Sequence, residues 1–242
     1  MLGARERVDS STMPCDLDRI FAHLAVRVPE TEESCLALSA ETLPRPPSAM
    51  NTDRLVIEKR YHAYNDSFRV DALHVYASKA TYCHLGLLAA AVLFSPAGTE
   101  VTLAFDHPAS NIRRLILRND GIATTPGFHS QPLVLNYYPS ETDKHPWVHA
   151  FERDVWRLPG FFLTNADESI GRESDWATRD TVVGFGTDEG TARLVELLLN
   201  ASRPSSRVDE FELECECGFR GVAPGSCEVR LWLPGSFGWQ HL

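Results

Sequence analysis

Two segments near the C-terminus, residues 211–217 and 227–233, alternate apolar and polar side chains with a period of two. This period is typical of antiparallel strands that have one packed face and one solvated face. The residues predicted to face the core are Phe211, Leu213, Cys215, Cys217, Val229 and Leu231. The residues predicted to face solvent are Glu212, Glu214, Glu216, Glu228, Arg230 and Trp232. Residues 218–226 contain three glycines and Pro224, so the two strands are expected to pair as a hairpin.

The middle of the chain predicts a second hairpin followed by a helix. Residues 54–64 and 68–77 are rich in β-branched and aromatic side chains and are separated by a short polar turn, which indicates two paired strands. Residues 79–94 are apolar on nearly all sides, and Ser78 precedes them as a capping residue. This pattern predicts a buried helix.

Two strand–loop–helix units are predicted beyond that helix. In the first, a strand at 101–105 leads to a helix from Pro108 to Asn119, with apolar residues at helical spacing. In the second, a strand at 181–185 leads to a Leu-rich helix at 191–200. A further strand is expected at 132–138. Together these patterns predict an α+β fold, with one largely antiparallel sheet and three or more packed helices.

The first 50 residues differ from the rest of the chain. They are polar and weakly patterned, with a short helix predicted near residues 16–26 and a proline-rich linker at residues 43–48. We therefore expect residues 1–50 to form an N-terminal arm and residues 51–242 to form a single α+β domain.

Charge limits the classes of partner. The chain carries 23 Lys+Arg against 33 Asp+Glu, a net charge of −10, so nucleic acid and anionic membrane surfaces are disfavoured as partners. A basic protein remains compatible. Residues 85–94 are the longest apolar run and are too short to span a bilayer. Charges near the N-terminus interrupt any secretory signal, and six dispersed cysteines fit reduced thiols, so we expect a cytoplasmic protein without cofactors.

Motifs that indicate phosphate binding, metal binding or catalysis are weak in this sequence. Gly184, Gly186 and Gly190 lie between a strand and a helix, but the acidic residues in that turn would repel a phosphate. His145 and His149 are four residues apart, the spacing of paired metal ligands on a helix, yet Pro146 between them disfavours a continuous helix. We therefore assign no catalytic residue and no metal ligand. A metal-dependent or acid–base hydrolase that uses the 139–180 region is kept as an alternative.

The acidic strand is the more informative pattern. Asp209, Glu210, Glu212, Glu214 and Glu216 place five carboxylates within eight residues. Like charges so close together destabilise a strand unless cations offset them, and they suit the surface that meets a basic protein. The predicted partner-binding residues are therefore Glu212, Glu214, Glu216, Arg230 and Trp232.

Residues 184–202, GFGTDEGTARLVELLLNAS, and residues 210–236, EFELECECGFRGVAPGSCEVRLWLPGS, follow a strand, glycine turn, Leu-rich helix and hairpin plan. In this order the C-terminal part resembles immunity proteins of bacterial polymorphic toxin systems. The resemblance implies a small acidic cytoplasmic protein that blocks a toxin by binding it, without catalytic residues. A non-catalytic structural or oligomeric protein is the other alternative.

Overall fold

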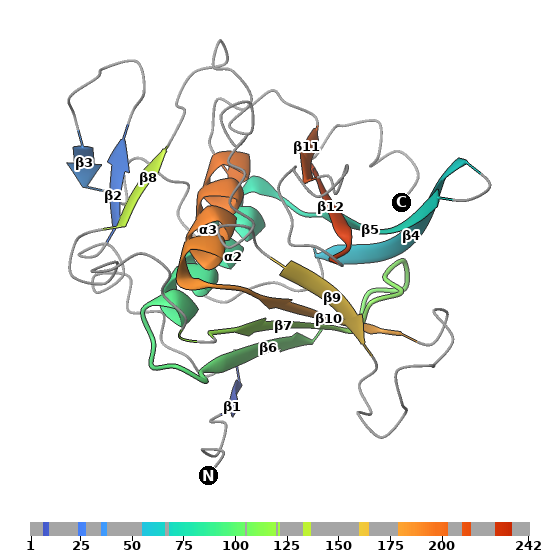
Figure 1. The fold of residues 1–242 in the computed structure, drawn as a ribbon, viewed down its shortest axis with the longest axis horizontal. Coiled ribbons are helices and arrows are strands. Elements are labelled where there is room, and N and C mark those ends of the chain that lie inside the picture. Colours follow the sequence, from blue (N-terminus) through green and yellow to red (C-terminus); the bar gives the residue numbers. More distant parts are fainter. Residues whose placement is uncertain are drawn as a thin grey trace.

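The structure is a computed structural model of the 242-residue chain. It describes residues 7–9, 24–27, 35–37, 55–65, 68–104, 106–119, 121, 133–136, 160–164, 179–202, 210–213 and 226–233. Within these residues the chain forms twelve strands and two helices (Figure 1). The α+β class is confirmed. The single sheet is not, because the strands form three separate sheets.

A four-stranded sheet joins two hairpins from distant parts of the chain. Its strands are β4 (Val56–Asn65), β5 (Phe68–Tyr76), β11 (Glu210–Leu213) and β12 (Glu228–Trp232), in the order β11-β12-β5-β4. Both predicted hairpins are present and antiparallel. They meet along β5 and β12, which run parallel, with Leu73 opposite Val229 and Val75 opposite Leu231.

A five-stranded sheet has the order β1-β6-β7-β10-β9. Its strands are β1 (Arg7–Asp9), β6 (Glu100–Ala104), β7 (Arg114–Arg118), β10 (Thr181–Phe185) and β9 (Gly160–Thr164). β6 pairs antiparallel with β7, and β9 with β10, whereas the β1–β6 and β7–β10 pairs are parallel. This sheet is mixed rather than largely antiparallel.

A small third sheet has the order β3-β2-β8 and consists of β3 (Cys35–Ala37), β2 (Leu24–Arg27) and β8 (Leu133–Asn136). The helix predicted near residues 16–26 is wrong at its end, because Leu24–Arg27 is a strand. Residues 16–23 lie outside the described residues. Strands β1 and β2 both belong to the first 50 residues, and they pair with β6 and β8 of the following part.

The helix predicted from Pro108 to Asn119 is wrong. Pro108 lies in a turn that the Ser110 N–H closes onto the His107 carbonyl at 2.9 Å, and the chain then forms β7. Along β7 the burial alternates, with Leu115 and Leu117 buried. A period of two fits a strand that lies between β6 and β10, and the sheet overrides the helical spacing.

The two helices pack directly against each other. Helix α2 (Lys79–Leu93) begins after Ser78, whose hydroxyl accepts the Thr81 N–H at 3.1 Å, as predicted. Helix α3 (Asp188–Ser202) begins three residues earlier than predicted. A Cβ built on Gly86 of α2 would lie 2.9 Å from Leu199 Cδ2 of α3, so glycine allows a close crossing of the two helices.

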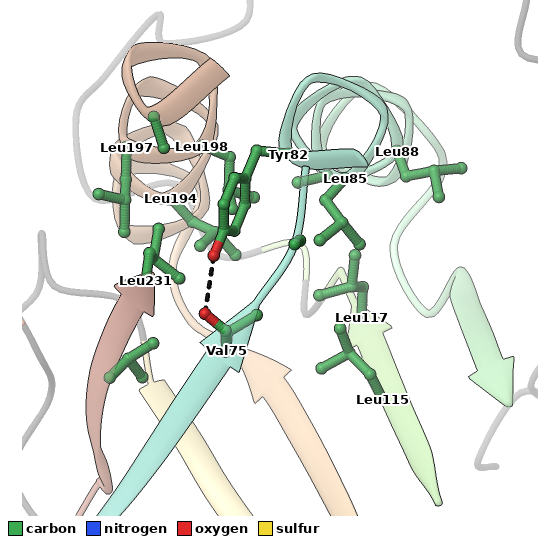
Figure 2. Close-up of a cluster of buried hydrophobic side chains, with 14 of the residues drawn as sticks. Val75, Tyr82, Leu85, Leu88, Leu115, Leu117, Leu194, Leu197, Leu198 and Leu231 are labelled. Carbon is green, nitrogen blue, oxygen red and sulfur yellow. Dashed lines mark hydrogen bonds between the residues drawn. The ribbon is translucent and has the colours of Figure 1, made fainter. Parts of the chain in front are cut away.

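The core lies where both helices cover both larger sheets. Leucines of α2 and α3 meet Leu115 and Leu117 of β7 and Leu231 of β12 (Figure 2). A cavity of about 40 Å³ remains among these aliphatic side chains. A void of this size holds about one water and stays dry when its lining is apolar, so it offers no room for a ligand.

Tyr82 of α2 ties the helix to the ends of two strands. Its hydroxyl lies 2.7 Å from the carbonyl oxygen of Val75 on β5 and 2.9 Å from that of Trp232 on β12. Figure 2 shows the ring descending from α2 toward Val75. Burial raises the pKa of Tyr82 well above its usual value, because the phenolate would be desolvated. Tyr82 thus holds the parallel β5–β12 pair against α2.

Candidate functional site

The predicted binding residues that the structure describes lie on the four-stranded sheet. Arg230 and Trp232 are on β12, and Glu212 on β11 lies opposite Arg230 in register. Glu214 and Glu216 lie outside the described residues. The register places Glu212, Arg230, His74 and Glu58 in one row across the sheet. The next row is Glu210, Trp232, Tyr76 and Val56.

The face of the sheet that lies away from Val229 and Leu231 is called the outer face here. Its described side chains are Val56, Glu58, Arg60, Ala72, His74, Tyr76, Glu228, Arg230 and Trp232. Each of them lies two residues from the next along its strand, so all of them project to the same side. The outer face therefore collects aromatic and charged side chains from β4, β5 and β12.

Three rings form the centre of the outer face. The indole N–H of Trp232 donates to Nδ1 of His74 at 3.1 Å, and the two ring centroids are 5.7 Å apart. Tyr76 stacks on Trp232 with centroids 6.1 Å apart and an interplanar angle of 10°. A half-buried tryptophan held by one hydrogen bond and one stacking contact has little rotamer freedom left to lose on binding.

An ion pair borders the rings. Arg60 donates to Oε2 of Glu58 through Nε at 3.0 Å and Nη2 at 2.8 Å, and Nη2 also donates to the Tyr76 hydroxyl at 3.2 Å. Burial alone lowers the pKa of Arg60, but its contacts with Glu58 and Tyr76 outweigh that effect and raise it. The guanidinium is a permanent charge that links the carboxylate of Glu58 to the aromatic rings.

The outer face is more buried than the sequence predicts. Alternation places Glu228, Arg230 and Trp232 in solvent, yet Glu228 is 1% exposed and the other two are half-buried. On β5, His74 is 3% exposed and Tyr76 is fully buried. Period two shows on which side of a sheet a residue lies, but it does not show what packs on that side. Among the outer-face side chains that the structure describes, the accessible ones are therefore Glu58, Arg60, Arg230 and Trp232.

Sequence reasoning missed His74 and Tyr76 as members of this site. The signal was present, because both belong to the predicted strand 68–77 and alternate there with Leu73 and Val75, which enter the core. What the sequence did not supply was the neighbour of β5. The parallel contact with β12 brings Trp232 onto these two rings, and it joins residues that are more than 150 positions apart.

A second polar cluster joins the two larger sheets. Lys59 is buried, a rare environment for lysine, and its Nζ donates to the carbonyl of Arg179 at 2.5 Å. Its backbone N–H donates to Oδ1 of Asn111 at 2.7 Å, and Ser110 Oγ donates to the Ile57 carbonyl at 2.8 Å. Asn111 and Ser110 form hydrogen bonds with backbone groups of β4, the edge strand of its sheet. We therefore assign this cluster a structural role.

Of the remaining sequence candidates, the structure describes only the glycine turn at residues 184–190. In the 184–190 turn, the Thr187 hydroxyl accepts the Gly190 N–H at 3.2 Å, and Asp188 and Glu189 are buried in the first turn of α3. His145 and His149 lie outside the described residues. No group of three or more His, Cys, Asp or Glu suited to a metal occurs among the residues described. No helix in the described ranges is long and apolar enough to cross a membrane.

Comparison of the chain with protein-family models, with curated proteins and with solved structures finds no match in any of the three. The functional proposal therefore depends on the geometry of the outer face.

Proposed function

We propose that this protein binds a basic protein partner through the outer face of its four-stranded sheet and neutralises it as a cytoplasmic immunity-type inhibitor. The observation that supports this most is the Trp232–His74–Tyr76 cluster. Tryptophan, tyrosine and arginine are the residues that most often dominate the binding energy of protein interfaces. Here Trp232 is already fixed in place by His74 and by the buried ring of Tyr76, and it lies beside Arg60 and Arg230.

Charge supplies the direction of binding. Strand β11 is the edge strand next to β12, and it brings Glu210 and Glu212 into register with Trp232 and Arg230. The whole chain carries a net charge of −10. A partner with a positive surface would be steered to this edge, because complementary charge speeds encounter and fixes orientation. The arginines of the outer face would then meet acidic groups within that basic surface.

Neutralisation of this kind needs no reaction. An inhibitor that covers the working surface of a toxin acts by exclusion, and its potency follows from affinity and a slow dissociation rate. Preorganised aromatic anchors favour slow dissociation, since little ordering entropy is lost when the complex forms. The proposed role thus requires a rigid face and not a catalytic group.

The test is co-expression of this chain with the product of each neighbouring coding region, followed by copurification, a growth assay and calorimetry of the purified pair. Trp232→Ala should weaken the complex by about 2 kcal/mol or more, roughly 30-fold, as expected for an interface anchor. Glu212→Lys should slow association and reduce its salt dependence.

Arg113→Ala is the matched control. Arg113 is a surface arginine in an ion pair with Asp106 at 3.2 Å, and it lies next to β7 in the other large sheet. Its removal should leave the affinity within twofold. The proposal fails if no neighbouring product binds. It also fails if folded Trp232→Ala and Glu212→Lys proteins bind as tightly as the wild type.

A further inference from the structure

The Trp232–His74 contact fixes the protonation state of His74. An indole N–H can only donate, so Nδ1 of His74 must carry a lone pair to accept it at 3.1 Å. The Tyr76 hydroxyl lies 3.5 Å from the same nitrogen. Because that hydroxyl already accepts a hydrogen bond from Arg60, its own proton is available to point toward Nδ1. Two donors thus converge on one acceptor nitrogen.

A proton on Nδ1 would remove this acceptor. The N–H of the ring would then oppose the N–H of the indole, and the 3.1 Å contact could not persist. His74 is only 3% exposed, so water does not readily replace the lost partner. The indole of Trp232 must then move, and its stacking on Tyr76 is lost with it.

Within the described part of the chain, the charged residues near His74 determine how strongly an added proton is attracted or repelled. Glu58 faces it from β4, but that carboxylate is engaged by Arg60 at 2.8 Å. Arg230 faces it from β12, with Glu228 two residues away on the same strand, and Tyr76 follows on β5 itself. Arg230 opposes a second positive charge, and Arg60 offsets the attraction of Glu58. Glu212 lies one strand further out in the same row.

We propose that the outer face is a proton-linked binding site, in which protonation of His74 releases Trp232 and weakens partner binding. Histidine is the side chain whose charge ordinarily changes between pH 5 and 8. The folded state holds the neutral ring, so acidification favours the state in which Trp232 has left His74. The effect on binding rests on the proposed function, whereas the movement of Trp232 does not.

The first experiment follows the indole N–H resonances of the full-length protein, labelled with ¹⁵N-tryptophan, from pH 8 to pH 4.5. The chain has five tryptophans, and Trp232→Phe assigns the one of interest. We expect the Trp232 resonance to shift or broaden in a single step, at the same midpoint as the ring signals of His74. In His74→Gln, whose side-chain oxygen can accept the indole N–H without titrating, the step should be absent.

Three results would overturn the switch. These are a Trp232 resonance that stays constant down to pH 4.5 in a folded protein, a step that persists in His74→Gln, and a midpoint that differs from that of His74. The midpoint comparison is made on the wild-type chain and does not need His74→Gln, so it decides the matter even if that variant does not fold.

The second experiment measures the affinity for the partner at pH 7.5 and pH 5.5. Wild type should bind at least tenfold more weakly at the lower pH, and His74→Gln should change by less than twofold. An equal loss in both proteins would show that the partner titrates instead, and would refute the link to binding. If no partner is found, the proposed function fails, while the indole titration still decides the switch.

Discussion

The side chain of Asn119 closes the C-terminal end of α2, and its removal should cost about 3 kcal/mol. Nδ2 of Asn119 donates toward the carbonyls of Val92 at 3.0 Å, Leu93 at 3.4 Å and Ser95 at 2.8 Å. Its Oδ1 accepts the N–H of Gly121 at 2.7 Å. The amide has two hydrogens to donate and makes one accepted bond, so three hydrogen bonds are lost in Asn119→Ala, each worth roughly 1 kcal/mol.

Burial makes this cost hard to recover, because Asn119 is 5% exposed and water has little access to the carbonyls at the end of the helix. The assay is urea unfolding followed by circular dichroism, with the slope against denaturant expected to stay unchanged. Thr99→Ala is the matched control from the same turn. Its hydroxyl donates to the Pro96 carbonyl at 2.7 Å at the surface, and its loss should cost under about 0.5 kcal/mol.

Asn119→Asp tests the loss of the Nδ2 donor without truncation, because aspartate has nearly the same size and shape as asparagine. It keeps the acceptor for Gly121 but sets a carboxylate against the negative end of a helix, so it should be less stable than Asn119→Ala at pH 7. The deficit should shrink as the pH falls toward 4 and the new carboxylate becomes neutral. The role assigned to Asn119 is refuted if Asn119→Ala costs no more than the control, or if Asn119→Asp is as stable as the wild type.

Substitutions at two further positions test the core. Gly86→Ala should be nearly neutral, since a gain of about 1 kcal/mol in helix propensity offsets a shift of the flexible end of Leu199, whereas Gly86→Val should cost about 2–3 kcal/mol by overpacking. Thermal unfolding measures both, and equal stability of the two variants would contradict a close crossing. Tyr82→Phe should cost about 1–2 kcal/mol at pH 8, because the carbonyls of Val75 and Trp232 lose their donor. The raised pKa of Tyr82 means that its contribution to stability is complete below pH 10 and is lost as the pH rises above it, so the stability of the variant should fall less steeply between pH 10 and 11. An unchanged slope there would show that Tyr82 is not buried.

The sequence predicts an element well where its periodicity fits one type of secondary structure and does not fit another. The buried helix at 79–94, the hairpin at 54–77 and the Leu-rich helix after Gly186 all form, because their periodicity agrees with their capping and turn residues. Segment 108–119 shows the opposite case. Its apolar residues fit a helix and a strand almost equally well, and the position between β6 and β10 selects the strand.

A local sequence pattern does not show which strands pair with each other in a sheet. Nothing in residues 68–77 indicates that β5 pairs with β12, since a parallel contact across so long a crossover depends on how α2, α3 and the five-stranded sheet fill the space between them. The predicted binding residues Arg230 and Trp232 lie on one face for a local reason, their alternation with Val229 and Leu231. Their environment, including His74 and Tyr76, arises only from the long-range pairing.

Trp232 links the proposed binding face to the core. Its carbonyl oxygen accepts the Tyr82 hydroxyl of α2 at 2.9 Å, while its indole donates to His74 on the outer face. The same residue therefore belongs to the core through its backbone and to the proposed binding face through its side chain. A substitution that keeps the backbone of β12 in place leaves the first contact intact and tests only the second. This is why Trp232→Phe and His74→Gln report on the outer face more cleanly than any change on α2.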